Sequence, residues 1–326
     1  MVLRNEFAYS QSRVDHALGF LAASVYSLSY YVVPGWFALS GALLLNQPGE
    51  ASTWAVTAPI ILSALLPPMA APWLLRTRAF KQIPAYFRYK EVLEIGPDEL
   101  RTLIHERPTM ISLHPHGVFS MAALCAAVQW SQTWWSPAKT PTAVASAILQ
   151  IPLLKHVVGT LGITSASSGP LVKALSSSTS SSHGVILYPG GTSELFLADP
   201  DHERLYLLQR KGFIRIALMQ GAALVPGYLF GNTRVLKLLQ WPVLRYISRK
   251  TGVALTYLYG RFWLPMPLPA QCMTVLGKPI LLPRIEAPTA EQVDHWHGVY
   301  VGEVRRIFDE YTGECEGYAG KVLEIE

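Results

Sequence analysis

The clearest pattern of hydrophobic and polar positions lies at the N-terminus, where two long stretches carry no charged residue. Residues 17–45 and 51–75 are 29 and 25 positions long. Each exceeds the roughly 20 apolar residues that a helix needs to cross a hydrocarbon layer of about 30 Å. The short connector between them predicts a membrane hairpin at 17–75, preceded by an N-terminal tail at 1–16. Two short, kinked or re-entrant helices are an alternative, because the two stretches contain Pro34, Gly35, Pro59, Pro67, Pro68 and Pro72.

Basic residues predict how this hairpin is oriented. The connector has no Lys or Arg, whereas Arg4 and Arg13 precede the hairpin and five basic residues lie between positions 76 and 90. Because cytoplasmic flanks of membrane helices are enriched in Lys and Arg, both ends of the hairpin are expected on the cytosolic side. Residues 76–96 are then predicted to be a basic linker to a domain at 97–326.

After residue 97, short β-branched runs alternate with stretches of helical period. One helix is predicted to start at Pro97, and others at 117–134, 153–161, 167–176, 211–220 and 290–311. Strands are predicted at 109–113, 142–146, 185–188, 223–229, 254–259 and 271–276. This alternation indicates an α/β fold with a mostly parallel central sheet flanked by helices. The serine-rich tract 176–182 is predicted to be a flexible surface loop.

Composition narrows the classes of protein. Of the 326 residues, 50% are hydrophobic and 15% are charged, against roughly 25% charged in soluble domains, which favours membrane attachment and excludes intrinsic disorder. Cys125, Cys272 and Cys315 are far apart, so we expect neither a disulfide framework nor a zinc site, and a reducing compartment fits best. Residues 108–284 carry a net charge of +11, which favours a polyanion or an anionic membrane surface as partner. Nucleic acid is not an expected partner, because no nucleic-acid-binding motif accompanies the charge.

The first candidate for chemistry is His114-Pro115-His116-Gly117, which follows the predicted strand 109–113. Functional residues of α/β sheets gather at the carboxyl ends of strands. A neutral imidazole is a suitable general base near pH 7. A zinc site would need a third ligand that the sequence does not supply nearby, so no metal is expected. The alternative is a pair of histidines hydrogen-bonded within an ordinary turn.

The second candidate follows the predicted strand 185–188 and contains Gly190, Gly191 and Glu194. The two glycines expose backbone amides of the kind that stabilise an oxyanion. Glu194 is the first acidic residue after Glu106, and a carboxylate that orients an imidazole makes a base–orienter pair. The alternative is a turn with a solvated acid.

Taken together, these residues resemble the type 2 diacylglycerol acyltransferase family, with its monoacylglycerol and wax-alcohol acyltransferase relatives, within the wider glycerolipid acyltransferase group. The resemblance rests on HPHG at 114–117, Gly190-Gly191 with Glu194, RKGF at 210–213, GAALVP at 221–226, Phe230-Gly231 and GKPI at 277–280. The wider group has an acid five positions after its histidine, where this chain has Phe119 or Met121, as HPHG members do. Asn232 stands where an acid is common in the family.

The resemblance implies transfer of an acyl group from acyl-CoA to diacylglycerol, producing triacylglycerol without a cofactor. His116, or alternatively His114, would be the general base, with Glu194 holding its imidazole. Pro115 and Gly117 would shape the turn, and backbone amides near Gly190 and Gly191 would stabilise the oxyanion. The phosphates of acyl-CoA are expected at basic residues near the helix 211–220 and beyond it, namely Arg210, Lys211, Arg234 and Lys237.

The same resemblance, together with the hairpin, predicts an endoplasmic reticulum membrane protein facing the cytosol, with lipid droplets as a further location. Membrane lipids are therefore expected partners, and Arg245, Arg249 and Lys250 are candidates for contacts with anionic headgroups. The acceptor is alternatively monoacylglycerol, a long-chain alcohol or a lysophospholipid. A function of another class is a non-catalytic, lipid-binding scaffold at the membrane surface.

Overall fold

A mixed β-sheet forms the centre of the protein in the computed structural model, which describes residues 2–7, 12–176, 184–239, 241, 243, 246 and 257–326. Its strands are neighbours in the order β1-β2-β11-β8-β3-β6-β4-β5, and β12 also pairs with β8. The run from β8 to β5 is parallel, whereas β11 and β12 are antiparallel to β8, and β1 is antiparallel to β2. The predicted α/β class is confirmed. The strands are β1 (Leu3–Glu6), β2 (Lys90–Leu93), β3 (Thr109–His114), β4 (Thr142–Val144), β5 (Ile163–Ser165), β6 (Gly184–Leu187), β8 (Ala223–Phe230), β11 (Met273–Leu276) and β12 (Ile280–Leu281).

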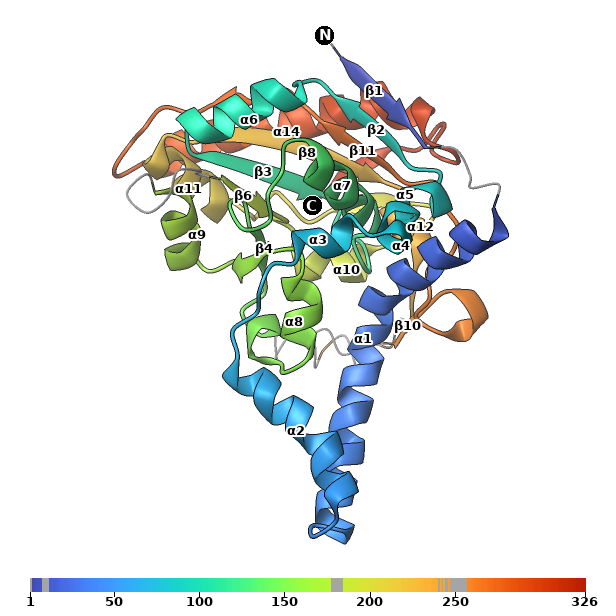
Figure 1. Cartoon of the computed structure of the whole chain (residues 1–326). Helices are drawn as coiled ribbons and strands as arrows, with labels where there is room; N and C mark the ends of the chain where they lie inside the picture. Colours follow the sequence, from blue (N-terminus) through green and yellow to red (C-terminus); the bar gives the residue numbers. More distant parts are fainter. Residues whose placement is uncertain are drawn as a thin grey trace.

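Helices cover both faces of this sheet (Figure 1). Successive residues of a strand point to opposite faces, and Met110 and Ile111 of β3 accordingly belong to two different hydrophobic cores. The core around Ile111 contains side chains of α1 (Arg13–Asn46), α5 (Ile83–Tyr86), α6 (Pro97–Glu106) and α7 (Met121–Thr133). The core around Met110 contains side chains of α9 (Ser168–Leu175), α11 (Gly212–Gln220) and α14 (Ala290–Tyr311). The central strands are therefore buried on both sides, as their continuous apolar runs require.

Short elements complete the described fold. Two small sheets lie apart from the central one, β9 (Lys237–Leu239) with β10 (Tyr257–Tyr259), and β7 (Glu203–Leu205) with β13 (Leu323–Ile325). The remaining short helices are α3 (Pro72–Leu75), α4 (Arg78–Lys81), α8 (Leu154–Gly159), α10 (Thr192–Leu197), α12 (Asn232–Val235), η1 (Ile148–Gln150), η2 (Arg261–Trp263) and η3 (Thr312–Glu314). All three cysteines are buried and unpaired, which agrees with the absence of a disulfide framework.

Several predicted boundaries differ from the structure. The helix predicted at 117–134 begins only at Met121, because Gly117 has a left-handed φ of 64° and the chain turns there before the helix starts. The strand predicted at 254–259 is described only from Tyr257, and it pairs with β9 instead of joining the central sheet. Residues 177–182 of the serine-rich tract, and Arg245, Arg249 and Lys250, lie outside the described residues.

The described residues of the predicted tail 1–16, and the predicted linker 76–96, are part of the folded domain. Leu3–Glu6 forms the edge strand β1, which pairs with β2 at Lys90–Leu93. Between α3 and β2, Ile83, Tyr86 and Phe87 are fully buried. The basic residues of 76–96 led to the prediction of a linker. In the structure, the apolar side chains between them fill the core, while the charged ends of the basic side chains stay at the surface.

The apolar N-terminal stretches form a hairpin of unequal helices. Helix α1 has 34 residues and is long and apolar enough to cross a membrane, but α2 (Ala51–Leu65) has only 15. At 1.5 Å per residue, α2 is about 22 Å long, shorter than a hydrocarbon layer of about 30 Å. The second predicted span, 51–75, is therefore not one helix; Pro67 and Pro68 follow α2, and the chain returns to the domain as α3.

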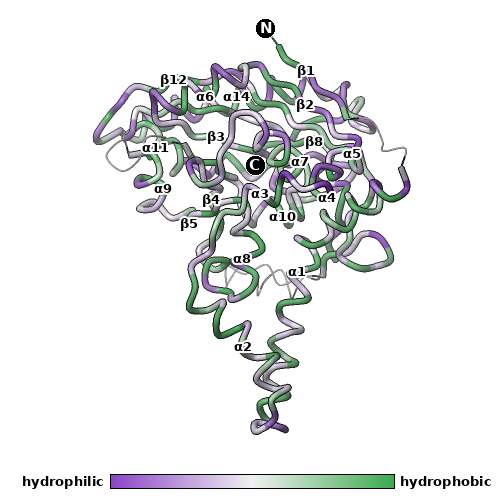
Figure 2. The backbone as a smooth tube through the Cα atoms, in the orientation of Figure 1, coloured by the Kyte–Doolittle hydropathy of each residue, from purple (hydrophilic) through white to green (hydrophobic). Residues whose placement is uncertain are grey.

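Only the distal part of the hairpin projects from the domain (Figure 1). The proximal part of α1 packs on the domain through small and aromatic residues such as Ala23 and Tyr26, which are buried. Further out, Ser40 Oγ and Thr57 Oγ1 form a buried 2.8 Å hydrogen bond that joins α1 to α2. Figure 2 shows that the projecting helices are largely hydrophobic, with polar residues at the connecting turn. The hairpin thus has the composition of a segment that enters a lipid layer.

Candidate active site

Strands β3 and β6 bring the two predicted motifs to one edge of the sheet. These strands are parallel neighbours, with Ser112 opposite Leu187. Because the carboxyl ends of parallel strands meet at one edge, the HPHG turn after β3 lies beside the turn that contains Gly190 and Gly191. That second turn leads into α10, whose first turn carries Glu194.

His114 is fully buried, and both of its ring nitrogens have partners. Its Nδ1 lies 3.2 Å from Glu194 Oε1, and its Nε2 lies 2.9 Å from the hydroxyl of Tyr300 on α14. The carboxylate of Glu194 only accepts a hydrogen bond from Nδ1. Burial raises the pKa of Tyr300, so its hydroxyl stays protonated and is able to donate to Nε2. In the neutral ring, Nδ1 then carries the hydrogen and donates it to Glu194. Neither nitrogen of His114 is left for a substrate in this conformation.

His116, in contrast, lines the pocket described below. Its Nδ1 is 3.0 Å from the carbonyl oxygen of Gly117. A carbonyl only accepts, so Nδ1 carries the hydrogen in the neutral ring and Nε2 keeps the lone pair. The ring packs edge-on against Tyr188, with centroids 5.1 Å apart. His116 Nε2 therefore has the electronic state that a general base requires.

Glu194 connects the two histidines, although not in the way that the sequence predicts. Its Oε1 accepts from the ring of His114, whereas its Oε2 accepts from the backbone N–H of His116 at 2.8 Å. The carboxylate thus holds the imidazole of His114 and the main chain of His116. The imidazole of His116 is instead oriented by the Gly117 carbonyl, which corrects the expectation that Glu194 orients the ring that faces the substrate.

Gly190 of the second motif makes room for this carboxylate, and Gly191 shapes the turn. A Cβ built on Gly190 would lie 2.0 Å from Glu194 Cδ and 2.1 Å from its Oε1. Gly191 has a left-handed φ of 56°, and its N–H donates to the Tyr188 carbonyl at 3.1 Å. Because that amide is already used inside the turn, it does not face a substrate as the predicted oxyanion donor would.

The side chain of Asn232 also holds the HPHG turn. This fully buried side chain accepts from the N–H of Ala122 at 2.9 Å and donates to the carbonyls of Pro115 and His116 at 3.0 and 3.3 Å. An acid at this position has no hydrogen to donate when ionised. Asn232, in place of the acid common in the family, thus lets this chain hold its histidine turn with two hydrogen bonds from a side-chain amide.

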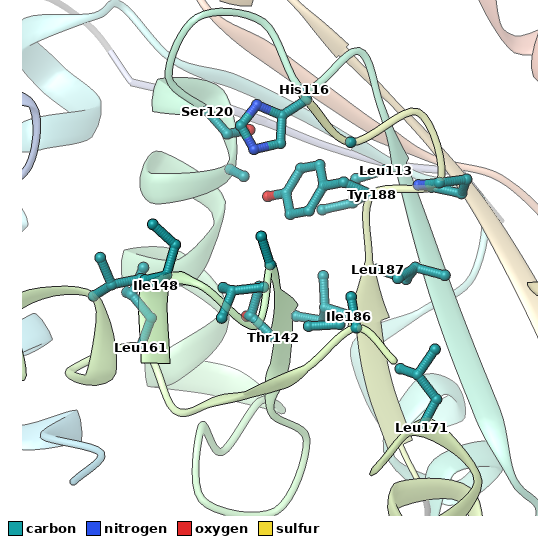
Figure 3. Close-up of a pocket in the computed structure, with 18 of the residues that line it drawn as sticks. Leu113, His116, Ser120, Thr142, Ile148, Leu161, Leu171, Ile186, Leu187 and Tyr188 are labelled. Atoms are coloured by element: carbon teal, nitrogen blue, oxygen red, sulfur yellow. The ribbon is translucent and has the colours of Figure 1, made fainter. Parts of the chain in front are cut away.

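His116 lies at one end of a pocket of about 1420 Å³. Figure 3 shows His116, Ser120 and Tyr188 gathered at that end, with Ile148, Leu161, Leu171 and Ile186 further along. Ligand pockets usually measure about 300–1,000 Å³, so this one has room for a long-chain lipid. Residues of α1 also contribute to its wall, namely Tyr30, Tyr31, Val33 and Pro34. The pocket therefore runs from the histidine turn to the base of the hairpin.

Two of the four predicted phosphate-binding residues reach the pocket. Arg210 and Lys211 line it, together with Arg215, which the sequence reasoning missed although it lies four positions after Lys211. Arg210 donates to Ser193 Oγ at 2.9 Å, and Lys211 pairs with Asp294 at 2.7 Å.

The other two predicted phosphate-binding residues lie elsewhere. Arg234 donates to the Glu316 carbonyl at 2.5 Å, and Lys237 is exposed on β9. Neither belongs to the residues that line the pocket. Basic residues are frequent throughout 108–284, so the sequence does not distinguish those that line the pocket from those that do not.

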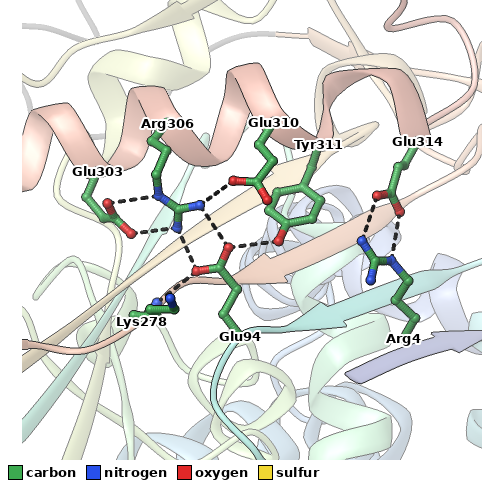
Figure 4. A network of polar contacts seen from close by, with 8 residues as sticks. All are labelled: Arg4, Glu94, Lys278, Glu303, Arg306, Glu310, Tyr311 and Glu314. Carbon is green, nitrogen blue, oxygen red and sulfur yellow. Dashed lines mark hydrogen bonds and ion pairs between the residues drawn. The ribbon is translucent and has the colours of Figure 1, made fainter. Parts of the chain in front are cut away.

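A polar network holds α14, the helix that carries Tyr300, against the sheet (Figure 4). Glu94, at the end of β2, accepts two hydrogen bonds from Arg306 at 2.6 and 2.9 Å and one from Tyr311 at 2.8 Å. Arg306 also pairs with Glu303 and Glu310 of its own helix, both at 2.6 Å. Burial opposes ionisation of Glu94, but the hydrogen bonds from Arg306 and Tyr311 outweigh it, and its pKa is lowered.

We predict that Glu94→Gln lowers the free energy of unfolding by about 1–3 kcal/mol, the usual cost of leaving buried partners of a charged hydrogen bond unpaired. Because the pKa of Glu94 is lowered by folding, its contribution is complete above the unfolded value of about 4.3 and is lost as the pH falls through the lower folded value. Denaturation in mild detergent between pH 7 and 3 measures this. The wild type should lose its advantage over Glu94→Gln in acid, with Glu286→Gln, at an exposed position outside the helices and strands, as a neutral control.

Among the residues described, no group of three or more His, Cys, Asp or Glu side chains is arranged to hold a metal ion. The described site consists of a histidine turn braced by a buried carboxylate, at the end of a large apolar pocket beside an apolar hairpin. Such a site is typical of an enzyme of the α/β class that binds lipids.

Comparison with known proteins shows the family to which the chain belongs. The diacylglycerol acyltransferase family model matches residues 70–325, so the chain belongs to that family. It is 29% identical to the human diacylglycerol O-acyltransferase 2-like protein 6, over 74% of this chain and 75% of the relative. It is 30% identical to the human acyl-CoA wax alcohol acyltransferase 1, over 65% of this chain and 68% of the relative.

Among solved structures, the chain is similar to the 1-acyl-sn-glycerophosphate acyltransferase PlsC from Thermotoga maritima. The TM-score is 0.43 at 13% sequence identity, over 89% of this chain and 96% of that chain. Family membership identifies an O-acyltransferase with lipid substrates, and together with the apolar helix α1 it points to a membrane protein.

Proposed function

We propose that this protein transfers the acyl group of acyl-CoA to diacylglycerol and so produces triacylglycerol. The observation that carries the proposal is the imidazole of His116, with its lone pair on Nε2, at the end of a large apolar pocket. Membership of the diacylglycerol acyltransferase family supports this reaction. The enzyme is a membrane protein of the endoplasmic reticulum in this proposal, with its catalytic domain in the cytosol, where acyl-CoA is available.

In the proposed step, His116 Nε2 takes the proton of the acceptor hydroxyl as its oxygen attacks the thioester carbonyl carbon. A C–O bond forms, and the carbonyl electrons move to the oxygen. Their return breaks the C–S bond, and the coenzyme A thiolate leaves and receives the proton from His116. No covalent enzyme intermediate or cofactor is required. His114 and Glu194 hold the turn on which His116 sits, and they act as positioning residues.

Basic residues that line the pocket are suited to the phosphates of coenzyme A. Arg210, Lys211 and Arg215 lie around the start of α11. The guanidinium of Arg210 keeps Nε unpaired in the structure, although the atom is buried. A buried donor without a partner is costly, and a phosphate oxygen would satisfy it.

Arg210→Ala should therefore raise the KM for acyl-CoA by about tenfold or more while kcat changes less, because a charged hydrogen bond contributes about 1.5–3 kcal/mol and 1.4 kcal/mol corresponds to a factor of ten. Initial rates at varied acyl-CoA concentration measure the effect. Lys237→Ala removes a cation outside the pocket and should leave KM unchanged. Equal effects of the two substitutions would contradict a phosphate site at Arg210.

The reaction itself is tested with membranes that contain the full chain, labelled oleoyl-CoA and dioleoylglycerol. Labelled triacylglycerol, absent from membranes without the protein, is the expected product. Monoacylglycerol, a long-chain alcohol and a lysophospholipid are supplied in parallel reactions. A preference for one of them would keep the chemistry and change the acceptor, and no transfer to any acceptor would favour a lipid-binding scaffold.

A further inference from the structure

An aromatic loop beside the hairpin has no role in the site described above. Residues 260–266 connect β10 to the segment before β11, and three consecutive apolar side chains of this loop face outward. Phe262, Trp263 and Leu264 are 70%, 71% and 46% exposed. Consecutive apolar side chains with such exposure are unfavourable in water and mark a surface that meets a partner.

The backbone of the loop presents these side chains at a conformational cost. Phe262 and Trp263 have left-handed φ values of 59° and 58°, which residues with a Cβ rarely adopt. Such conformations persist only where surrounding contacts impose them. Here the Arg261 N–H donates to Met266 at 2.8 Å and the Gly260 N–H donates to Leu264 at 2.7 Å. The outward position of the two aromatic rings is therefore built into the loop.

The loop is continuous with the apolar hairpin. Figure 1 shows it beside α1, at the level where that helix leaves the domain. The guanidinium of Arg261 lies 5.5 Å from the ring centroid of Phe20 on α1. On the strand that leads into the loop, the N–H of Leu258 donates to the hydroxyl of Tyr31 at 2.5 Å. The contacts of Arg261 and Leu258 fix the loop to the base of the projecting helices.

The chemistry of the loop favours a lipid surface over a protein partner. Aromatic side chains are favoured at the boundary between lipid headgroups and hydrocarbon. Arg261 lies next to them, with its guanidinium 5.4 Å from the Phe262 ring centroid, and a cation at this level is attracted to headgroup phosphates. The part of α1 beyond Tyr31 is about 22 Å long at 1.5 Å per residue. A lipid layer that contains this part has its surface near Leu258, on the strand that leads into the loop.

We propose that Phe262 and Trp263 insert into the interface of the membrane that the hairpin enters, as a second and shallow anchor. Two separate attachment points fix the tilt of the domain, which a single hairpin leaves open. Leu258 and Tyr31 line the pocket, so the anchor also holds the hairpin end of the pocket at the lipid surface. The proposal concerns attachment to lipid and stands whether or not the proposed acyl acceptor is correct.

The test uses the full chain in vesicles of phosphatidylcholine and phosphatidylserine. Trp263→Cys is labelled with an environment-sensitive fluorophore, which is selective because the native cysteines are buried. We expect the emission of the label to shift to the blue in vesicles. We also expect this emission to be quenched when lipids that carry a nitroxide at a shallow depth are included. Phe262→Cys is a second labelling site in the same loop, in case the first variant does not fold.

Leu281→Cys is the matched control, because Leu281 is an apolar side chain, 54% exposed, on a strand far from the hairpin (Figure 2). Its label should show neither the shift nor the quenching. Emission at 262 and 263 that remains water-like in vesicles would overturn the proposal and leave a protein partner for the loop. Equal quenching at 263 and 281 would overturn it too, because the fluorophore alone would then explain the signal.

Discussion

Replacing His116 with alanine should lower the rate of acyl transfer by about 10²–10⁴-fold, the usual contribution of a general base. The reason is that His116 lines the pocket and has Nε2 unprotonated in its neutral form. Initial rates with saturating acyl-CoA and diacylglycerol measure the loss.

His114 provides the matched comparison, since it belongs to the same turn but is enclosed by Glu194 and Tyr300. Glutamine has an amide that donates and a carbonyl that accepts, so His114→Gln retains groups for both contacts. We expect it to keep far more activity than His116→Gln. If His114→Gln were inactive and His116→Gln were active, the base would be His114, and the turn would have to rearrange when substrate binds.

Gly190→Ala should lower kcat by about 10²-fold or more while the protein stays folded. The added Cβ would lie 2.0 Å from Glu194 Cδ, so the carboxylate must move away from His114 and from the backbone of His116. A displacement of about 1 Å in a catalytic group is enough for a loss of this size. Rates and unfolding curves measured on the same preparation separate lost positioning from lost stability.

Gly302→Ala is the control for this substitution. Gly302 lies within α14, and a Cβ there meets nothing within 4 Å. Alanine in a helix is favoured over glycine by about 0.5–1 kcal/mol, so this variant should be fully active and slightly more stable. Normal activity of Gly190→Ala would mean that catalysis does not depend on the position of the Glu194 carboxylate between His114 and His116.

The class of fold was predictable because it depends on local patterns. Runs of β-branched residues and helical periods repeat along the chain, and α14 occupies the predicted residues Ala290–Tyr311. The predictions are wrong where contacts with residues distant in the sequence determine the structure. The sequence predicts a linker at the basic segment 76–96, yet Tyr86 and Phe87 fill the core and β2 joins the sheet. The end of α2 at Leu65 is an exception, because Pro67 and Pro68 mark it in the sequence.

By itself, the sequence determined the apolar hairpin, the alternation of strands and helices, and the two motifs at strand ends. Each of these depends on residues within a few positions of one another, through hydrophobic period and turn chemistry. Tertiary structure alone decided which histidine lines the pocket, how Glu194 divides its two oxygens, and that Arg210 and Lys211 line the pocket while Arg234 and Lys237 do not.

The physical reason is distance along the chain. His114 meets Glu194 across 80 residues and Tyr300 across 186, and such contacts exist only once the sheet and α14 are packed. Asn232 is another residue whose contacts cannot be predicted from the sequence, which shows only that an amide replaces an acid. The folded chain shows that this amide donates to the carbonyls of Pro115 and His116.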